Sequence, residues 1–551
     1  MKLFIRKNMH FLFLFFAICL FLTSCLTNNG YFARISTQNI IIYEFKQCLL
    51  LISFFIFGYL LLKLLQNKLS EMWICLLSFP AGLSLYVFCA EAFLLCDFTM
   101  QLWRVFVLEI IFLGLLFLIR FKRQRSFIKF PATSFVPMIT VVCSIALVLS
   151  TGFIYIGLNY DSYFYFANYG NTLSKFMCYK DFISDDTYVL TNIGQFLPIA
   201  CSYAYFWGLD APHCIHVAML SVSILSFGYF IYEKSITNQM TSKRAILLTS
   251  IFLIMLLSCS PFFLFGTWLL SNSWIMFYMI FFYIIFDKYV HSKESLSFEY
   301  AFILCGILLS ITMLRKDGLV IACFLIIIIS FFQASQYYTR SDTVLYPNLK
   351  SRMKDSLVLG LIFLPSLIYM TMYIYVIKHV LYATVHTAWG TSLLSGKATQ
   401  LILLSLATLL FVIILYRPIE FIFRRFLPLA GLLSFAVLIC YYIYKSPNDF
   451  LDYIDTWARN LTGIGFGYSI FMLLFLVCII ILLSKRIDCH IFLLFGYILL
   501  TVVLYWNKGV GEQDIDNSAL RAMIQIIPIL FMVCASRIIE RHAILFPSRT
   551  S

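Results

Sequence analysis

The chain has 551 residues, of which 62% are hydrophobic and only 12% are charged, and its mean hydropathy is +0.92. Soluble globular domains carry about 25% charged residues, so this composition excludes a soluble enzyme or binding module. The formal net charge of +14 comes from short basic clusters between apolar runs. Such clusters are typical of loops on the cytoplasmic side of a membrane rather than of a nucleic-acid-binding surface.

Apolar runs recur along the whole chain. A helix that crosses a bilayer needs about 20 apolar residues, and by this measure the sequence predicts about sixteen spans. They cover residues 8–26, 40–62, 72–95, 102–120, 136–157, 212–232, 245–265, 267–287, 299–314, 319–335, 356–377, 398–416, 427–444, 464–483, 489–506 and 519–536. The predicted fold is therefore an all-α, polytopic transmembrane helix bundle with no large soluble domain.

The predicted spans fall into two parts. Residues 1–135 form the N-terminal transmembrane helices, and residues 136–551 form a transmembrane core that contains the most polar segment between spans, 158–211. Within the first part, residues 1–25 have a basic start and an apolar run, which predicts either a cleaved signal peptide or a retained anchor. Either choice leaves the rest of the topology unchanged.

Lysine and arginine clusters set the predicted orientation. Counting the spans places every cluster on one side, so we expect both termini in the cytoplasm. Short loops and the lack of a eukaryotic sorting signal favour the plasma (inner) membrane. The run 299–335 would make a single helix of about 55 Å, far longer than a hydrocarbon core of about 30 Å. Residues 315–318 are therefore predicted to form an outward-facing turn between two short spans.

Charged side chains are scarce on that outer side, and three groups of them are candidates for chemistry. Asp161, in GLNYDSYFYFANYG, follows a span and could take a proton from a hydroxyl, or it could simply cap a helix. Arg315 and Lys316 could bind a phosphate, or they could pair locally with Asp317. Arg521 opens the last span and could grip a phosphate with two parallel bonds, or reach toward lipid headgroups.

These residues also carry a resemblance to a known family. The acid among aromatics in NYDSYFYFANYG, the run MLRKDGLVIACFL and the last-span segment ALRAMIQIIPIL resemble elements of GT-C fold integral membrane glycosyltransferases. Protein O-mannosyltransferases and bacterial aminoarabinose transferases belong to this group. Unlike the family pattern, no second acid follows Asp161 directly, and the nearest substitutes are Asp185 and Asp186.

The resemblance implies an inverting glycosyltransferase, hexosyl or pentosyl, that uses a polyprenyl-phosphate sugar donor. Asp161 would be the base that deprotonates the acceptor hydroxyl. Arg315, Lys316 and Arg521 would hold the donor phosphate and stabilise its charge as the bond breaks. The acceptor would be a glycan, a lipid or a protein.

The resemblance also implies how the sugar is bound. Tyr160 and Tyr163 would line the sugar site. Asp185 or Asp186 would bind sugar hydroxyls or a divalent cation. Members of the family differ in whether they need a metal, so a cation is left open, and no metal ligand is assigned.

Two other functions remain possible interpretations of the sequence. One is a transporter or flippase of lipid-linked glycans, and the other is a polymerase of such glycans. Transporters often show repeated halves and broken helices at mid-membrane, whereas the ionisable groups here gather at one face. His213 and His216 share one helix face, but they have no third ligand, which favours a structural role over a metal site.

Overall fold

The computed structural model describes most of the chain. The described ranges are 37–65, 69–96, 98–124, 166–176, 194–209, 212–266, 269–291, 298–315, 317–339, 349–376, 403–404, 406–410, 427–448, 450–452, 469–484, 487–505 and 523–545. Within these ranges the regular elements are helices, and no strand occurs. The prediction of an all-α fold is confirmed for this part of the chain.

Seven of the described helices are long and apolar enough to cross a membrane. They are α2 (Thr37–Leu65), α3 (Glu71–Leu95), α4 (Leu102–Gln124), α9 (His213–Thr237), α12 (Ser271–His291), α15 (Leu349–Val376) and α18 (Leu427–Lys445). Shorter apolar helices are α8 (Phe196–Phe206), α13 (Phe298–Leu314), α14 (Gly318–Thr339), α20 (Ser469–Leu483) and α21 (Cys489–Tyr505). The remaining helices are α6 (Asn168–Phe176), α10 (Ser242–Ser258), α11 (Ser260–Gly266) and α23 (Ile527–Leu545).

Every predicted span that is largely described coincides with helix, with two adjustments. The span predicted at 245–265 is two helices, α10 and α11, because Cys259 has an extended backbone (ψ 101°) and Pro261 lacks the N–H needed to continue the helix. The last span is displaced, since α23 runs from Ile527 to Leu545 rather than ending at 536. Spans 8–26 and 136–157 lie outside the described residues, and so does most of 398–416, so the total of sixteen stays a prediction.

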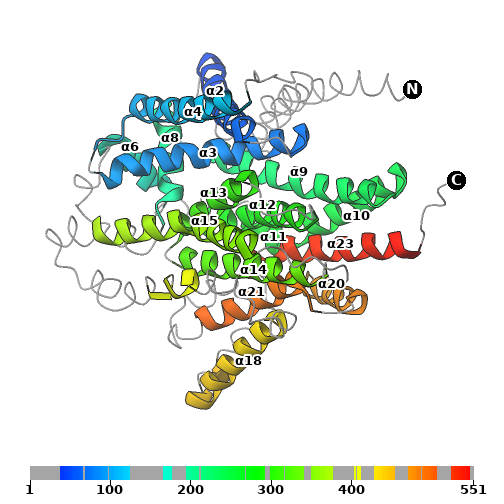
Figure 1. The fold of residues 1–551 in the computed structure, drawn as a ribbon. Helices are drawn as coiled ribbons and strands as arrows, with labels where there is room; N and C mark the ends of the chain where they lie inside the picture. The colour runs from blue at the N-terminus through cyan, green and yellow to red at the C-terminus, as the bar shows by residue number, and fades with distance from the viewer. Residues whose placement is uncertain are drawn as a thin grey trace.

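The helices differ greatly in how much of their apolar surface is covered. The most apolar window of α12 is 89% buried, whereas that of α4 is 17% buried and that of α18 only 6%. In Figure 1, α12 lies in the middle of the molecule, α4 lies at one edge beside α2 and α3, and α18 lies at the opposite edge. The exposed apolar faces of α4 and α18 are those expected of helices in contact with lipid.

The closest helix pair is α2 and α3. A Cβ added to Gly58 would lie 1.8 Å from the carbonyl oxygen of Ser78, and one added to Gly82 would lie 1.9 Å from that of Phe54. Only glycine allows backbones to approach this closely, as at many helix crossings in membranes. The pair therefore forms a rigid wall at one edge of the bundle.

The helices alternate in direction, and this gives the bundle two ends. At one end, which we call the Lys234 end, α9, α12 and α23 finish while α3 begins, and their side chains are joined by ion pairs and hydrogen bonds. At the other, the Arg315 end, α12 begins and α13 gives way to α14. This alternation agrees with the predicted topology, while the assignment of the Lys234 end to the cytoplasm stays a prediction.

Candidate functional site

The α13–α14 turn is the part of the predicted site that the structure describes best. It lies where it was predicted, between Leu314 and Gly318. The Arg315 Nε donates to Asp317 Oδ1 at 2.8 Å, and its NH1 donates to Asn272 Oδ1 at 2.7 Å. The side chains of Arg315 and Asp317 are only 16% and 19% exposed. The local pairing predicted as one alternative is thus present for Arg315, and it braces the turn against the start of α12.

The start of the last predicted span reaches the same turn. The Gln525 Nε2 donates to Asn272 Oδ1 at 2.7 Å, so this one carbonyl oxygen accepts from both Gln525 and Arg315. The Tyr497 hydroxyl of α21 donates to Gln525 Oε1. Gln525 lies within the predicted last span, 519–536. The α13–α14 turn and the beginning of the last span, distant in sequence, therefore meet at Asn272.

The part of the polar segment 158–211 that directly precedes α8 also packs on the α13–α14 turn. A Cβ added to Gly194 would lie 2.0 Å from the Met313 carbonyl oxygen and 2.5 Å from the Arg315 nitrogen, so only glycine fits there. The next residue, Gln195, is fully buried and donates from Nε2 to the Tyr373 hydroxyl at 2.9 Å. Three far-apart segments thus converge at the Arg315 end.

A buried acid that the sequence analysis missed lies close to this convergence. Glu91 is 2% exposed within α3 and lies near Tyr369 and Tyr373 of α15. Tyr373 in turn binds Gln195, which follows the glycine packed on Arg315. The sequence did contain a signal, because an acid inside a spanning helix is costly and commonly marks a functional position.

Most of the individual residues predicted for the site fall outside the described part of the chain. These are Tyr160, Asp161, Tyr163, Asp185, Asp186, Lys316 and Arg521. Their roles stay predictions. Within the polar segment 158–211, α8 forms from an apolar run, and its residues Phe196 to Ala204 are buried against other helices.

A metal site finds no support in the residues that the structure describes, where no three His, Cys, Asp or Glu side chains gather. Of the predicted His pair, His216 is fully buried and both ring nitrogens are bonded. Its Nδ1 accepts from the Trp274 indole at 2.9 Å, and its Nε2 lies 2.8 Å from the Gly266 carbonyl oxygen. His216 therefore joins α9, α11 and α12, as a structural histidine would.

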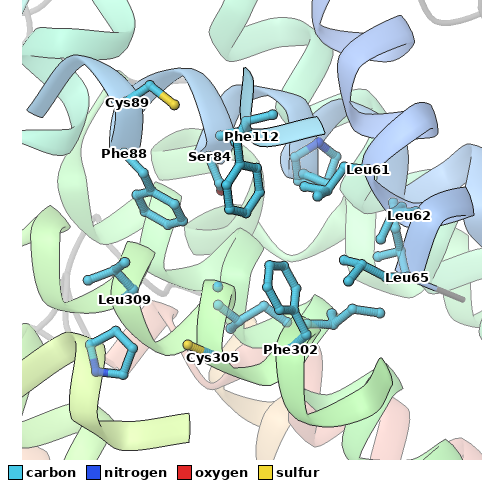
Figure 2. Close-up of a pocket in the computed structure, with 18 of the residues that line it drawn as sticks. Leu61, Leu62, Leu65, Ser84, Phe88, Cys89, Phe112, Phe302, Cys305 and Leu309 are labelled. Atoms are coloured by element: carbon cyan, nitrogen blue, oxygen red, sulfur yellow. The ribbon is translucent and has the colours of Figure 1, made fainter. Parts of the chain in front are cut away.

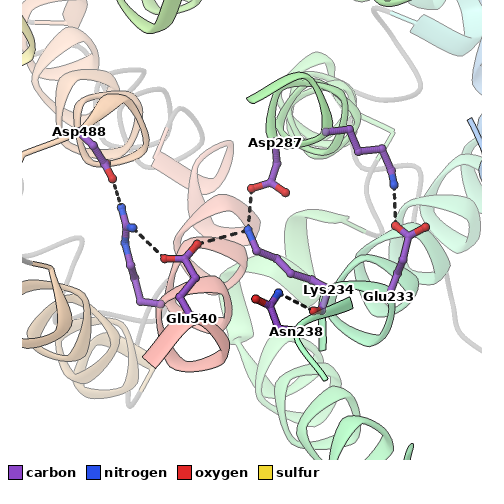
Figure 3. A network of polar contacts seen from close by, with 8 residues as sticks. Glu233, Lys234, Asn238, Asp287, Asp488 and Glu540 are labelled. Atoms are coloured by element: carbon purple, nitrogen blue, oxygen red, sulfur yellow. Dashed lines mark hydrogen bonds and ion pairs between the residues drawn. The ribbon is translucent and has the colours of Figure 1, made fainter. Parts of the chain in front are cut away.

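The Lys234 end carries a network of ion pairs, shown in Figure 3. Lys234 Nζ lies 2.7 Å from Asp287 Oδ1 and 3.6 Å from Glu540 Oε1. Arg537 bonds both Glu540 and Asp488, so the network ties α9, α12 and α23 to the start of α21. Its basic members partner acids of neighbouring helices, which marks it as a structural clamp rather than an open ligand site.

Asp488 shows how strongly this clamp favours charged side chains. Burial by itself raises the pKa of the Asp488 carboxyl. Interaction with His490 and Arg537, together with hydrogen bonds from the Ile491 amide and Arg537, outweighs burial and leaves the pKa below its ordinary value. The carboxylate thus stays ionised and bound to Arg537 at neutral pH.

Comparison with known proteins does not assign this chain to a family. No protein-family model matches the sequence, and no curated protein or solved structure matches the chain. The resemblance to GT-C fold glycosyltransferases therefore stays a prediction from the motifs, and the function rests on the site alone.

Proposed function

We propose that this protein is a membrane glycosyltransferase that moves a sugar from a polyprenyl-phosphate donor to an acceptor hydroxyl at the Arg315 end of the bundle. The observation that supports it is the meeting of three segments there. Gly194 lies between Asp161 and α8 in the sequence, Arg315 precedes Lys316, and Gln525 follows Arg521 in the start of the predicted last span. The proposal is that these segments carry Asp161, Lys316 and Arg521, which are far apart in the sequence, to one site.

The proposed reaction assigns a balanced role to each group. The Asp161 carboxylate takes the proton of the acceptor hydroxyl, whose oxygen attacks the anomeric carbon and inverts it. The bond between that carbon and the phosphate oxygen breaks, and the lipid phosphate leaves with the electron pair. Lys316 and Arg521 stabilise the charge that develops on the phosphate, while Arg315 holds the turn in place through Asp317 and Asn272.

Transfer assays on the full chain in lipid nanodiscs test this function. The donor is the polyprenyl-phosphate sugar pool extracted from the native membrane, and release of free polyprenyl phosphate is the readout. Asp161→Asn should lower transfer by about 100-fold or more, the usual contribution of a general base. Lys316→Ala should raise the apparent KM for the donor.

The matched control is Lys243→Ala, which removes an exposed cation at the Lys234 end and should leave both constants unchanged. Undiminished transfer by Asp161→Asn would contradict the proposed base. If wild-type protein moved intact lipid-linked sugar between leaflets without releasing polyprenyl phosphate, the flippase alternative would replace the transferase.

A further inference from the structure

Glu109 of α4 is a buried acid that the proposed reaction does not use. It is the single acid of this helix and is only 1% exposed, although Ile110 and Ile111 beside it are 59% and 52% exposed. The helix therefore turns apolar side chains toward lipid and its acid toward the bundle. An acid inside a membrane span is costly and commonly marks a functional position.

The groups that face Glu109 do not neutralise a carboxylate. They are Tyr86 and Cys89 of α3 and Tyr203 of α8. The Tyr203 hydroxyl lies 2.7 Å from that of Ser53 on α2, in a hydrogen bond of its own. Within the described part of the chain, Oε2 of Glu109 has no hydrogen-bond partner and no cation acts on the carboxyl. An ionised Glu109 would therefore be an uncompensated buried charge.

Water does not replace the missing cation, because the space beside Glu109 is apolar. A cavity of about 440 Å³ lies there, and Figure 2 shows Phe112 of α4 and Cys89 of α3 among the residues that line it. The hydroxyl groups of the lining belong to Ser84 and Tyr278, which bond each other at 2.7 Å. An apolar cavity of this kind stays dry.

The helix that carries Glu109 is held against the bundle by little surface. The most apolar window of α4 is 17% buried, compared with 83% for that of α3. Its ring contacts include Phe106, which stacks on Phe57 of α2 at 5.7 Å and meets Tyr203 edge-on at 6.0 Å. Glu109 lies about 10 Å along α4 from the start of the helix. A modest outward shift of α4 is therefore enough to bring the carboxyl toward the membrane surface.

We propose that Glu109 is a reversible proton-binding site that controls the packing of α4. With the proton bound, the neutral carboxyl is tolerated in its dry surroundings and α4 lies against α2 and α3. When the proton leaves, the carboxylate has neither a cation nor water beside it, so α4 moves outward until the charge is hydrated. The inference does not depend on the proposed sugar transfer.

Dicyclohexylcarbodiimide, a lipid-soluble reagent, tests whether the proton is bound when it is added to the full chain in nanodiscs. The carboxyl proton passes to a nitrogen of the reagent while a carboxyl oxygen bonds to its central carbon. The acyl group then migrates to nitrogen, which gives a stable N-acylurea without a leaving group. We expect mass spectrometry to find this adduct on Glu109 at neutral pH in the wild type and no adduct in the α4 peptide of Glu109→Gln.

Asp287 is the matched control within the same molecule. It is also buried, but it is bonded to Lys234 at 2.7 Å and should stay ionised and unlabelled. Labelling of Glu109 no stronger than that of Asp287 would overturn the proposal. Protection of Glu109 by sodium ions at constant pH would overturn the proton as the ligand in favour of a sodium ion. Asp161→Asn should leave the labelling intact, which separates this result from a failure of the proposed transferase.

The native thiol of Cys89, which is 7% exposed and faces Glu109, reports the movement of α4. Its reaction with a lipid-soluble maleimide is followed by mass spectrometry as the pH is raised from mildly acidic to mildly alkaline. Any thiol reacts faster as the pH rises, so Glu109→Gln, or Glu109→Met should that variant fail to fold, is the reference. We expect the rise in the wild type to exceed the rise in the reference at least about five-fold. An equal rise in both would overturn the control of α4 by Glu109.

Discussion

Lys234 and Asp287 are each only 8% exposed, which makes them the most deeply buried ion pair among the residues described. A buried pair contributes little net stability compared with apolar residues, because both charges lose their hydration. Removing Asp287 is a different matter, since it leaves buried Lys234 with only Glu540, which lies 3.6 Å away and is shared with Arg537. In this protein the remaining charge would lie among α9, α12 and α23, so the effect should extend to the whole Lys234 end.

We therefore expect Asp287→Leu to lower the free energy of unfolding by about 3–5 kcal/mol. The double variant Lys234→Met/Asp287→Leu should recover most of this loss, because it removes both buried charges and leaves Glu540 paired with Arg537. Thermal unfolding of the purified variants in detergent measures both. Glu71→Gln, at the more exposed pair with Lys63, is the control and should cost no more than about 1 kcal/mol. A double variant as unstable as the single one would refute the explanation.

At the scale of the helices, the structure depends on a few places where backbones touch. The crossing of α2 and α3 at Gly58 and Gly82 is the clearest, because each glycine faces a carbonyl group of the other helix. Damage to this crossing should therefore lower the stability of the bundle.

We expect Gly58→Leu to separate α2 from α3 and to destabilise the protein by more than the 1–3 kcal/mol typical of overpacking, because the clash is with backbone. Gly114→Leu is the matched control, since a Cβ there meets open space, and it should be tolerated. Thermal unfolding and retention of the monodisperse peak in size-exclusion chromatography measure the effect. Equal stability of the two variants would show that α2 can shift at little cost.

The helices themselves could be predicted from apolar run length, because hydrocarbon forces backbone groups to bond within each span. Their exact ends could not be. The helix break at Cys259, before Pro261, was not predicted within the span 245–265. The extension of α23 to Leu545 includes Arg537 and Glu540, which pair with Asp488 and Lys234. Such partners depend on tertiary packing, which no local pattern contains.

At the scale of the whole molecule, the alternating helices separate two chemically different ends. The turn between α3 and α4 carries the exposed Cys96, and that between α9 and α10 carries the exposed Gln239. Because α3 begins at the Lys234 end and spans about 37 Å, Cys96 lies at the opposite end from Gln239.

We expect a membrane-impermeant maleimide to label Cys96 in intact cells. A cysteine introduced by Gln239→Cys, in a Cys96→Ser background, should react only after the membrane is permeabilised, because the two ends face different compartments. Cys96→Ser alone controls for the other exposed thiols. Labelling of both positions from the same side would contradict the spanning arrangement, and the reverse pattern would invert the predicted orientation.

The candidate site was only partly predictable. The sequence located the turn at Arg315, because a charged run there interrupts an apolar stretch too long for one span. It did not locate the start of α23, which begins at Ile527 rather than at residue 519. It could not reveal Asn272 or Gln195, because single amides in or beside apolar spans show no distinguishing spacing. Glu91 was detectable as an acid inside a span, but its neighbours on α15 were not. Their roles emerge only when α3, α8 and α12 are brought together.

The side-chain oxygen of Asn272 accepts two hydrogen bonds, which fixes the orientation of this amide. Its oxygen is held by Arg315 and Gln525, so the amide cannot rotate without setting its own N–H groups against two other donors. Replacing its nitrogen by oxygen, as in aspartate, would preserve both contacts and yet cancel the cation beside them. A one-atom exchange, without any change of shape, could thus turn an electropositive turn into a neutral one.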